Sequence, residues 1–221
     1  MPLDIWSETE DFLSLLLCPP DADLERAVRV SDQENLPPIS VSALQGKQIS
    51  LLASIAGASR ILEVGSLAGY SALWLAKALP PDGRMVTIEN NPVHAAVAAG
   101  NIRAAGLADR VEVRVGNAAE QLALLVEENV EPFDFFFIDA DQHNNAIYFE
   151  SCLQLGRSGS VIVIDNAVRS GEVCNVDTPN AAVRATQRVL ELVGSAEHVD
   201  GVVFQTIGKR GHDGMLVTRI R

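Results

Sequence analysis

The sequence predicts an α/β protein built on a mostly parallel, doubly wound sheet with helices on both faces. Two observations lead to this fold class. From residue 59 onward, short apolar runs alternate with longer Ala- and Leu-rich segments, which is the pattern of strands joined by crossover helices. The apolar runs are nearly continuous instead of alternating with polar residues, as expected for strands that are covered on both faces.

Five strands are predicted in this part of the chain, and each ends in a glycine, an amide or a carboxylate. They are RILEVG (60–65), RMVTIE (84–89), VEVRVG (111–116), FDFFFID (133–139) and SVIVIDN (160–166). The predicted helices between them are YSALWLAKAL (70–79), PVHAAVAAGNIRAAG (92–106), NAAEQLALLVEEN (117–129) and NNAIYFESCLQLG (144–156). Pro92 near a helix start, and Gly106 and Gly156 at helix ends, agree with these bounds.

The two ends of the chain depart from this alternation. HVDGVVFQTIG (198–208) and GMLVTRIR (214–221) are predicted to be strands joined by the turn KRGHD, which makes a hairpin. Residues 1–58 are predicted to be helical with a break at PPIS (37–40), and they are too few to bury a core of their own. We therefore expect a single domain, 1–221, in which residues 59–221 form the ligand-binding core and residues 1–58 a lid or an oligomerisation arm.

Composition and charge exclude several classes of function. The chain has 221 residues, a formal net charge of -12 and three scattered cysteines. The excess of acids leaves too few Lys and Arg residues to build a phosphate-binding face for nucleic acid. The start of the chain lacks a basic secretion signal, and no apolar run is long enough to span a bilayer. We expect a cytoplasmic protein with reduced thiols and with no nucleic-acid or membrane partner.

Polar side chains gather where the predicted strands end. In open α/β sheets the ligand lies beyond the carboxyl ends of the strands, at the point where the strand order reverses. The five strand ends comprise residues 63–65, 89–91, 116–117, 139–141 and 165–166. Because these segments meet at one edge of the sheet, they predict a single pocket lined by carboxylates, amides and glycines.

The segment EVGSLAGYS (63–71) has the spacing G-x-x-x-G and lacks the middle glycine of the dinucleotide fingerprint. Alone, its glycines are explained equally well by an ordinary tight turn. Glu89, at the end of the second strand, can accept both hydroxyls of a ribose. Glu63 would repel a pyrophosphate and attract a positive centre. The combination favours a nucleoside with a positive charge over a nicotinamide dinucleotide.

Four motifs follow one another along the chain: ILEVGSLAGYSALWLA (61–76), the strand end at Glu89, FIDAD (137–141) and VIVIDN (161–166). In this order they resemble the cation-dependent O-methyltransferases, which include catechol and caffeoyl-coenzyme A methyltransferases and small bacterial enzymes. The resemblance extends from about Ser40 to the C-terminal hairpin. It implies a Rossmann-like, seven-stranded sheet with an antiparallel last strand, S-adenosylmethionine as cofactor, a divalent cation (Mg²⁺, or else Ca²⁺ or Mn²⁺) and a homodimer.

The resemblance also assigns roles to residues by position. The residues that match metal ligands are Asp139, Asp165 and Asn166. Those that match cofactor contacts are Glu63, Gly65, Ser71, Glu89, Asn117, Ala118 and Asp139. Mg²⁺ prefers oxygen ligands in octahedral geometry, so two carboxylates and one amide leave positions for two substrate oxygens. The expected acceptor is a small hydroxylated aromatic molecule with a vicinal diol, selected by walls formed from residues 1–40 and 168–180.

One position departs from the family pattern. Relatives typically carry a lysine three residues after the first metal-ligand Asp, as general base or as positioner of the reacting hydroxyl, and this chain has Gln142 there. Glutamine cannot take up a proton at ordinary pH. Three interpretations stay open: the metal alone ionises the hydroxyl, His143 acts as the base, or the protein binds the cofactor with weak or lost catalysis. The catalytic candidates are therefore Asp139, Gln142 and His143.

Aspartates at strand ends also occur in roles that involve no metal. Asp139 and Asp165 would each serve as a helix cap, although Asn166 beside one of them favours a ligand site. An apolar run followed by D-x-D is also typical of phosphatases with a nucleophilic Asp, but there it lies on the first strand of the sheet. His94 and His198 are interpreted as helix-surface or loop residues.

Overall fold

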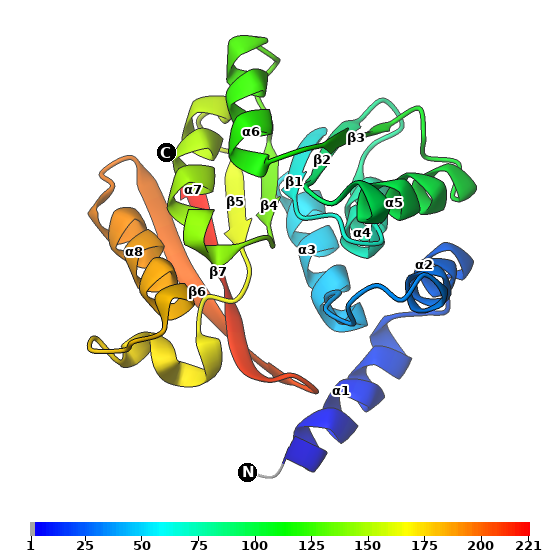
Figure 1. Cartoon of the computed structure of the whole chain (residues 1–221), viewed down its shortest axis with the longest axis horizontal. Coiled ribbons are helices and arrows are strands. Elements are labelled where there is room, and N and C mark those ends of the chain that lie inside the picture. Colours follow the sequence, from blue (N-terminus) through cyan, green and yellow to red (C-terminus); the bar gives the residue numbers. More distant parts are fainter. Residues whose placement is uncertain (1–2) are drawn as a thin grey trace.

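The fold is a seven-stranded sheet with helices on both faces (Figure 1). The computed structural model describes residues 3–221, so that Met1 and Pro2 of the predicted N-terminal segment lie outside the described residues. The strands are β1 (Arg60–Val64), β2 (Arg84–Glu89), β3 (Val111–Val115), β4 (Phe135–Ile138), β5 (Val161–Ile164), β6 (Val199–Gly208) and β7 (Gly211–Ile220). Their spatial order is β3-β2-β1-β4-β5-β7-β6.

The strand directions confirm the predicted topology. β1 to β5 pair in parallel, whereas β7 is antiparallel to both of its neighbours, β5 and β6. The strand order reverses between β1 and β4, because the chain first builds outward to β3 and then returns to the other side of β1. Connections that leave this point in opposite directions open a crevice at the carboxyl ends of β1 and β4.

β4 shows how each strand is covered on both faces. Phe135 and Phe137 belong to a core that includes residues of α2 (Ala22–Gln33), α3 (Ala43–Ile55), α4 (Tyr70–Ala78) and α5 (Pro92–Ala104). Phe136 and Ile138 belong to a second core with residues of α6 (Ala118–Glu127), α7 (Asn145–Leu155) and α8 (Ala181–Ser195). Because successive side chains of a strand point to opposite faces, a continuous apolar run supplies both cores at once.

The observed elements differ from the predicted ones mainly near the C-terminus. The predicted turn KRGHD is wrong in extent, since Gly208 pairs with Gly211 and only Lys209 and Arg210 connect the strands. Gly211 has φ +93, a left-handed conformation that permits the sharper reversal. The sequence interpretation contains no equivalent of α8, although Asn180 caps that helix and its buried residues recur at helical spacing.

The N-terminal segment is helical from residue 3, as predicted, but it is interrupted twice, at 18–21 and at 34–42, where the sequence predicts one break at 37–40. α2 and α3 contribute Leu24, Ala27, Ile49 and Ala53 to the core. α1 (Leu3–Leu17) extends to the bottom of the molecule in Figure 1, near the β6–β7 turn. There the Glu10 carboxylate accepts a hydrogen bond from the backbone N–H of Lys209 (2.6 Å). None of the helices in the described part of the chain has the length and apolar character needed to cross a membrane.

Candidate functional site

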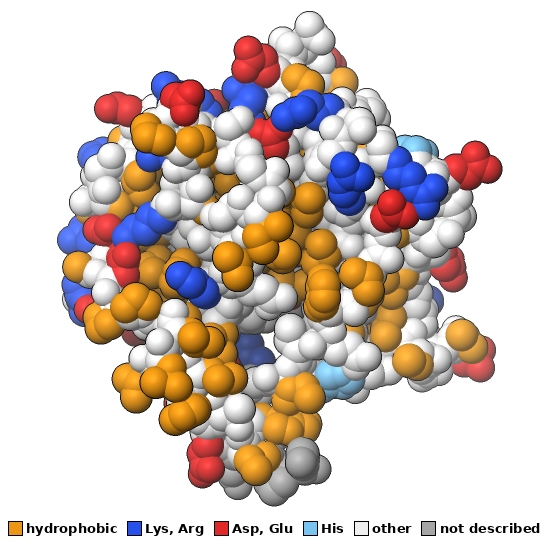
Figure 2. Space-filling view, turned by 180° about the vertical axis from the view of Figure 1, so that it is seen from behind, with side chains coloured by type: hydrophobic (Ala, Val, Ile, Leu, Met, Phe, Trp, Pro, Cys, Tyr) orange, Lys and Arg blue, Asp and Glu red, His pale blue; other side chains and the backbone are white. Residues whose placement is uncertain are grey.

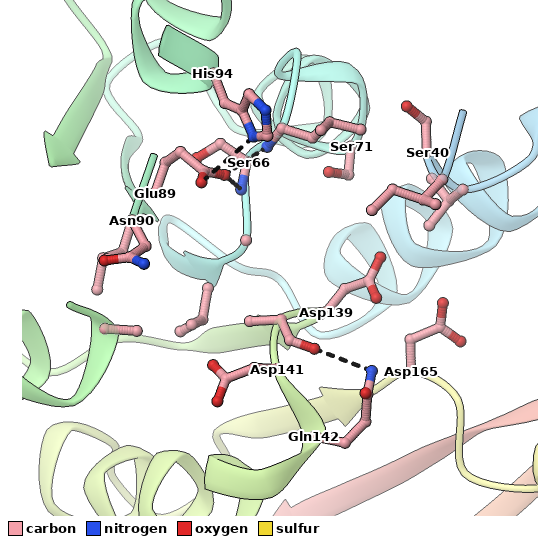
Figure 3. A pocket seen from close by; sticks show the side chains of 18 of the residues that line it. Ser40, Ser66, Ser71, Glu89, Asn90, His94, Asp139, Asp141, Gln142 and Asp165 are labelled. Carbon is pink, nitrogen blue, oxygen red and sulfur yellow. Dashed lines mark hydrogen bonds and ion pairs between the residues drawn. The ribbon is translucent and has the colours of Figure 1, made fainter. Parts of the chain in front are cut away.

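A cavity of about 570 Å³ lies at the carboxyl ends of the central strands (Figure 3). Its wall combines strand ends, the first turns of α4 and α6, the loop before α3 and the β6–β7 turn. The predicted site residues that line it are Gly65, Ser71, Glu89, Asn117, Ala118, Asp139, Gln142, Asp165 and Asn166. Glu63 and His143 are the predicted residues that do not line it. The structure thus brings most of the predicted site to one cavity.

Gly65 allows the ends of β1 and β4 to lie in direct contact. It has φ +101, and a Cβ atom at this position would overlap the carbonyl oxygen of Asp139. The backbone N–H of Asp139 donates to the carbonyl of Val64 (2.9 Å). A larger residue would be strained at this φ and would also push the Asp139 segment away. The glycine therefore positions the carboxylate of Asp139 beside the turn that follows β1.

Glu89 organises that same turn. Its Oε2 accepts hydrogen bonds from the backbone N–H groups of Leu67 (2.8 Å) and Ser66 (3.2 Å), and its Oε1 accepts one from Asn91 (2.9 Å). A carboxylate has about four acceptor positions, so capacity for a ligand hydroxyl remains. His94 Nδ1 lies 3.8 Å from Oε1, and His94 lines the cavity. His94 lies on the helix surface as interpreted, with its side chain 21% exposed, and it also lines the cavity because α5 begins directly after the end of β2.

Glu63 lies behind the wall of the cavity and is fully buried. Its Oε2 accepts a hydrogen bond from the Thr87 hydroxyl (2.5 Å), which lies 2.5 Å from the Ser66 hydroxyl. Its Oε1 has no hydrogen-bond partner among the described residues. Burial raises the pKa of Glu63 to about 7, although the hydroxyls of Ser71 and Thr87 oppose the shift. Glu63 thus connects to the site through Thr87 and Ser66 instead of forming its surface.

Asp139 and Asp165 lie on neighbouring strand ends at the other side of the cavity (Figure 3). Burial, followed by the negative charge of Glu63, raises the pKa of Asp139. Burial, followed by the negative charge of Asp139, raises the pKa of Asp165. Asn166 has φ 61, a left-handed conformation that Asn tolerates, and its N–H donates to Asp165 Oδ1 (2.8 Å). The ionised carboxylates are therefore disfavoured unless a cation compensates them.

This donor set fits a hard divalent cation. Within the described part of the chain, no group of three or more His, Cys, Asp or Glu side chains could hold a metal ion. A site at Asp139 and Asp165 would therefore need the amide oxygen of Asn166 as its third protein ligand. Two carboxylates and one amide oxygen are the ligand types that Mg²⁺ and Ca²⁺ prefer. They leave coordination positions for other oxygen atoms.

Gln142 and His143 begin the short 3₁₀ helix η1 (Gln142–Asn144), but they face different surroundings. Gln142 Nε2 donates to the carbonyl of Ala140 (3.0 Å) and to Asn166 Oδ1 (3.4 Å). Its side chain thus bridges the loop after β4 and the loop after β5. His143 is exposed and is absent from the wall of the cavity. Gln142 and His143 are the two candidates to replace the family lysine, and of these Gln142 lines the cavity.

Several wall residues lie outside the predicted set. The Tyr148 hydroxyl donates to Asp141 Oδ1 (2.5 Å), and burial and the charge of Asp141 raise the pKa of Tyr148. Asp141 is visible in the sequence as the second acid of D-x-D, and Tyr148 follows it in the first turns of the next helix. Arg210 also lines the cavity, and it comes from a turn that no local motif connects with the strand ends.

The predicted contribution of other segments to the wall is only partly found. Ile39 and Ser40, from the N-terminal segment, line the cavity, whereas no residue of 168–180 does. The reason is a bond to β7: the N–H groups of Val168 and Arg169 donate to Asp213 Oδ1 (3.0 and 3.1 Å). These bonds hold the start of that segment against the hairpin.

Comparison with known proteins agrees with this geometry. The family model described as O-methyltransferase matches residues 20–220. The chain belongs to this O-methyltransferase family. It is 41% identical over 217 residues to the catechol O-methyltransferase of Niastella koreensis, covering 98% of both chains. The predicted family and the predicted enzyme class, an S-adenosylmethionine-dependent O-methyltransferase, are confirmed.

Solved structures of similar methyltransferases share the whole fold. The O-methyltransferase from Bacillus cereus, solved with SAH, has a TM-score of 0.97 and 43% identity and covers 100% of both chains. The O-methyltransferase TomG from Streptomyces achromogenes, solved with SAM, has a TM-score of 0.95 and 40% identity, covering 100% of this chain and 99% of its own. The Rossmann-like arrangement predicted for this methyltransferase is therefore confirmed.

Proposed function

We propose that this methyltransferase moves a methyl group from S-adenosylmethionine to a hydroxyl of a small catechol-like aromatic acceptor in a metal-dependent reaction. One observation carries the proposal: a single cavity holds Glu89 on one side and the oxygen-donor set of Asp139, Asp165 and Asn166 on the other. The complex of the Bacillus cereus relative with SAH supports the cofactor. Two relatives named catechol O-methyltransferase support the acceptor class.

The cofactor occupies the β2 side of the cavity in this proposal. Glu89 accepts the ribose hydroxyls, and Asn117 and Ala118 contact the nucleoside at the start of α6. Ser71 lies in the first turn of α4, where the helix dipole favours the carboxylate of the methionine group. Glu63 lies behind this part of the wall and holds Thr87, which contacts Ser66. The positive sulfonium then lies among acidic side chains, which agrees with the lack of a pyrophosphate-binding glycine.

The acceptor occupies the β5 side. When bound, a divalent cation would supply Lewis-acid stabilisation that makes the hydroxyl more acidic. Asp139, Asp165 and Asn166 would hold that cation, and the walls of the cavity would place the acceptor oxygen in line with the methyl group. Methyl transfer is a displacement between two bound molecules, so this alignment supplies much of the rate enhancement.

We infer that Gln142 positions groups and does not move a proton. Its amide donates toward Asn166 Oδ1, so it helps to fix one of the proposed metal ligands. The exposed His143 is the remaining candidate for a base. The geometry favours the interpretation in which the metal alone makes the hydroxyl acidic. A second candidate function, cofactor binding with weak or lost catalysis, is favoured by one observation, the glutamine at the position of the family lysine.

Transfer of a labelled methyl group from S-adenosylmethionine to a panel of catechols, with Mg²⁺ or with excess chelator, tests the proposal. We expect product only with the metal. Full activity in chelator would exclude the metal-dependent mechanism, and tight cofactor binding without any transfer would favour the second candidate.

Variants of the two polar residues after β4 test the catalytic assignment. Gln142→Lys should raise turnover on weakly acidic acceptors, because a well-placed general base is worth roughly 10²–10⁴-fold. His143→Ala should change the rate little. A collapse of activity in His143→Ala, with cofactor and metal binding intact, would instead identify His143 as the base.

We also propose a homodimer, in which α1 serves as an oligomerisation arm. Exposed apolar side chains cluster on three elements, α1, α3 and the edge strand β6: Phe12, Leu15, Leu16, Leu17, Leu51, Ile55, Val202, Phe204 and Ile207. Figure 2 shows hydrophobic side chains across the face of the molecule seen from behind. An apolar face next to an unpaired strand edge is typical of a protein interface. Sedimentation should show a dimer, and Phe204→Asp with Ile55→Asp should give a monomer.

Two further inferences concern the domain organisation and the location of the protein. We infer a single domain, because α2 and α3 share the core of the sheet. We infer a cytoplasmic location from the cysteines, since Cys18, Cys152 and Cys174 are all free thiols in the described structure. Localisation of a tagged full-length chain tests the second inference.

A further inference from the structure

Arg210 differs in charge from the rest of the cavity wall. Among the described residues that line the cavity, it alone has a Lys or Arg side chain. The acids in the same wall are Glu89, Asp139, Asp141 and Asp165. The cofactor's sulfonium and a divalent cation would account for these acids. Neither of those cations needs an arginine, so Arg210 has no role in the reaction proposed above.

The backbone holds Arg210 at the acceptor side of the cavity. Its two terminal nitrogens donate to the carbonyl oxygens of Ile39 (3.0 Å) and Pro38 (3.1 Å). Ile39 lines the cavity as well. Arg210 directly precedes β7, and β7 pairs with β5 and extends past its carboxyl end. The guanidinium is therefore on the β5 side of the site, where the acceptor is proposed to bind.

The guanidinium keeps unused donors. It has five N–H groups, and the two hydrogen bonds to the 38–39 backbone use two of them. Within the described residues, Arg210 forms no ion pair with a carboxylate. The neighbouring Lys209, by contrast, pairs with Asp11 and does not line this cavity. An oriented, exposed cation with free N–H groups thus faces the cavity in which an aromatic acceptor is proposed to bind.

We propose that Arg210 is a specificity-determining residue that selects acceptors with a carboxylate on the aromatic ring, that is, dihydroxy aromatic acids. The proposal rests on the function proposed above and narrows its acceptor class. The ring's two hydroxyls bind at Asp139, Asp165 and Asn166, and its carboxylate binds Arg210. Guanidinium and carboxylate form charge-assisted hydrogen bonds, which are about twice as strong as neutral ones.

A matched pair of probes tests the proposal: 3,4-dihydroxybenzoate and its methyl ester. Their affinities for the SAH-bound protein with Mg²⁺ are measured by calorimetry, and their kcat and KM by methyl transfer. We expect the wild type to prefer the acid, and Arg210→Gln to reduce the acid-to-ester affinity ratio by about 10- to 100-fold, the effect of losing hydrogen bonds to a charged group. Arg210→Lys should recover part of the ratio. Lys209→Gln, which removes the neighbouring charge, should leave the ratio intact.

Three results would overturn the proposal. Equal losses for acid and ester in Arg210→Gln would mean that Arg210 only holds the 38–39 backbone. A loss confined to SAH affinity would assign Arg210 to the carboxylate of the cofactor. Equal affinities of the wild type for the acid and the ester would show that the protein does not select acceptors by their carboxylate.

Failure of the proposed function looks different. In that case neither probe is methylated, while the calorimetric preference for the acid still depends on Arg210. If both probes are methylated at rates independent of Arg210, the proposed function stands and the inference about Arg210 fails.

Discussion

β4 has an aspartate at each end, and the two carboxylates have opposite surroundings. Asp134, before the strand, accepts hydrogen bonds from the N–H (2.9 Å) and hydroxyl (2.9 Å) of Ser59, the N–H of Arg60 (3.0 Å) and the guanidinium of Arg157. Asp139, after the strand, accepts no side-chain hydrogen bond from the described residues. One strand of four residues therefore separates a satisfied acid from an unsatisfied one.

The pKa shifts follow this difference. Burial acts to raise the pKa of Asp134, but hydrogen bonds from Ser59, Arg157 and Arg60 outweigh it and lower the pKa. For Asp139, burial and the charge of Glu63 act in the same direction and raise the pKa. Buried polar groups are normally satisfied within the protein, so an unsatisfied acid in a cavity indicates a partner from outside the chain. Asp134 stabilises the fold, and Asp139 is available to a ligand.

The largest expected effect comes from Asp139→Asn. Methyl transfer with Mg²⁺ should fall by about 10²–10³-fold, the usual loss when one preorganised electrostatic contact is removed. The free energy of unfolding in chelator should stay constant or rise, because a disfavoured buried charge is lost. Initial rates and urea titrations measure the two quantities. A marked loss of stability without metal would show that Asp139 supports the fold and contradict the comparison.

Asp134→Ala should have the opposite pattern. The free energy of unfolding should fall by about 3 kcal/mol at neutral pH, since the change leaves several buried donors without an acceptor. The affinity for SAH, measured by calorimetry on the folded variant, should change by less than about threefold. Arg157→Ala is the matched control, and it should cost about 1 kcal/mol or less, because the Arg157 side chain is 62% exposed. Weak SAH binding by folded Asp134→Ala would show that Asp134 also supports the cofactor site, which would contradict its assignment to stability alone.

Glu89→Ala extends the comparison to the proposed cofactor side. The change should weaken the binding of S-adenosylmethionine by about 1–3 kcal/mol. Glu89 both holds the turn after β1 and is proposed to bind the ribose, so a cofactor analogue without the 2′-hydroxyl separates the two effects. The variant should lose less affinity for that analogue. Equal losses for both compounds would limit Glu89 to holding the turn. Glu112→Ala, which removes an exposed acid from β3, serves as the charge control.

The smallest effect concerns pH. Glu63, Asp139 and Asp165 have raised pKa values in the fold, so between about pH 5 and 8 the folded protein holds more protons than the unfolded chain. Its free energy of unfolding in chelator should therefore fall as the pH rises. Asp134, with a lowered pKa, adds stability that is lost only as the pH falls below about 4. Thermal unfolding across this range measures both trends.

Added Mg²⁺ and one variant sharpen the pH prediction. With Mg²⁺, the free energy of unfolding should fall less steeply above pH 5, because the metal compensates the charges of Asp139 and Asp165. Glu63→Gln should remove the contribution of Glu63 to that fall. Stability that rises between pH 5 and 8 without metal would show that these carboxyls are already satisfied.

The sheet and its ligand edge are predictable because they depend on local sequence. Runs such as FDFFFID identify a strand covered on both faces, and parallel strands bring their carboxyl ends to one edge. That rule alone gathers Glu89, Asp139 and Asp165. The same rule could have placed His94 at the site, because it lies in the first turn of α5, the helix that follows the end of β2. The signal for α8 was also present, in its cap and its helical spacing.

Other parts of the site depend on contacts that no local pattern encodes. Arg210 donates a hydrogen bond to the carbonyl of Ile39, which is 171 residues away in the sequence. This contact forms only when the hairpin packs beside the N-terminal segment. The orientation of Gln142 toward Asn166 likewise depends on two loops that the sheet brings together. Sequence reasoning found both residues of that pair but could not show that they touch.

The two-residue turn between β6 and β7 has a consequence for how this enzyme can diverge. The proposed cofactor side is built from strand ends, whose positions are fixed by the parallel hydrogen-bond ladder. Arg210 and Ile39 instead belong to two connections that lie outside that ladder. Exchanges at 38–40 and 209–210 leave the hydrogen bonds of that ladder intact. New acceptors can therefore be acquired by editing two short loops while the use of the methyl donor is inherited unchanged.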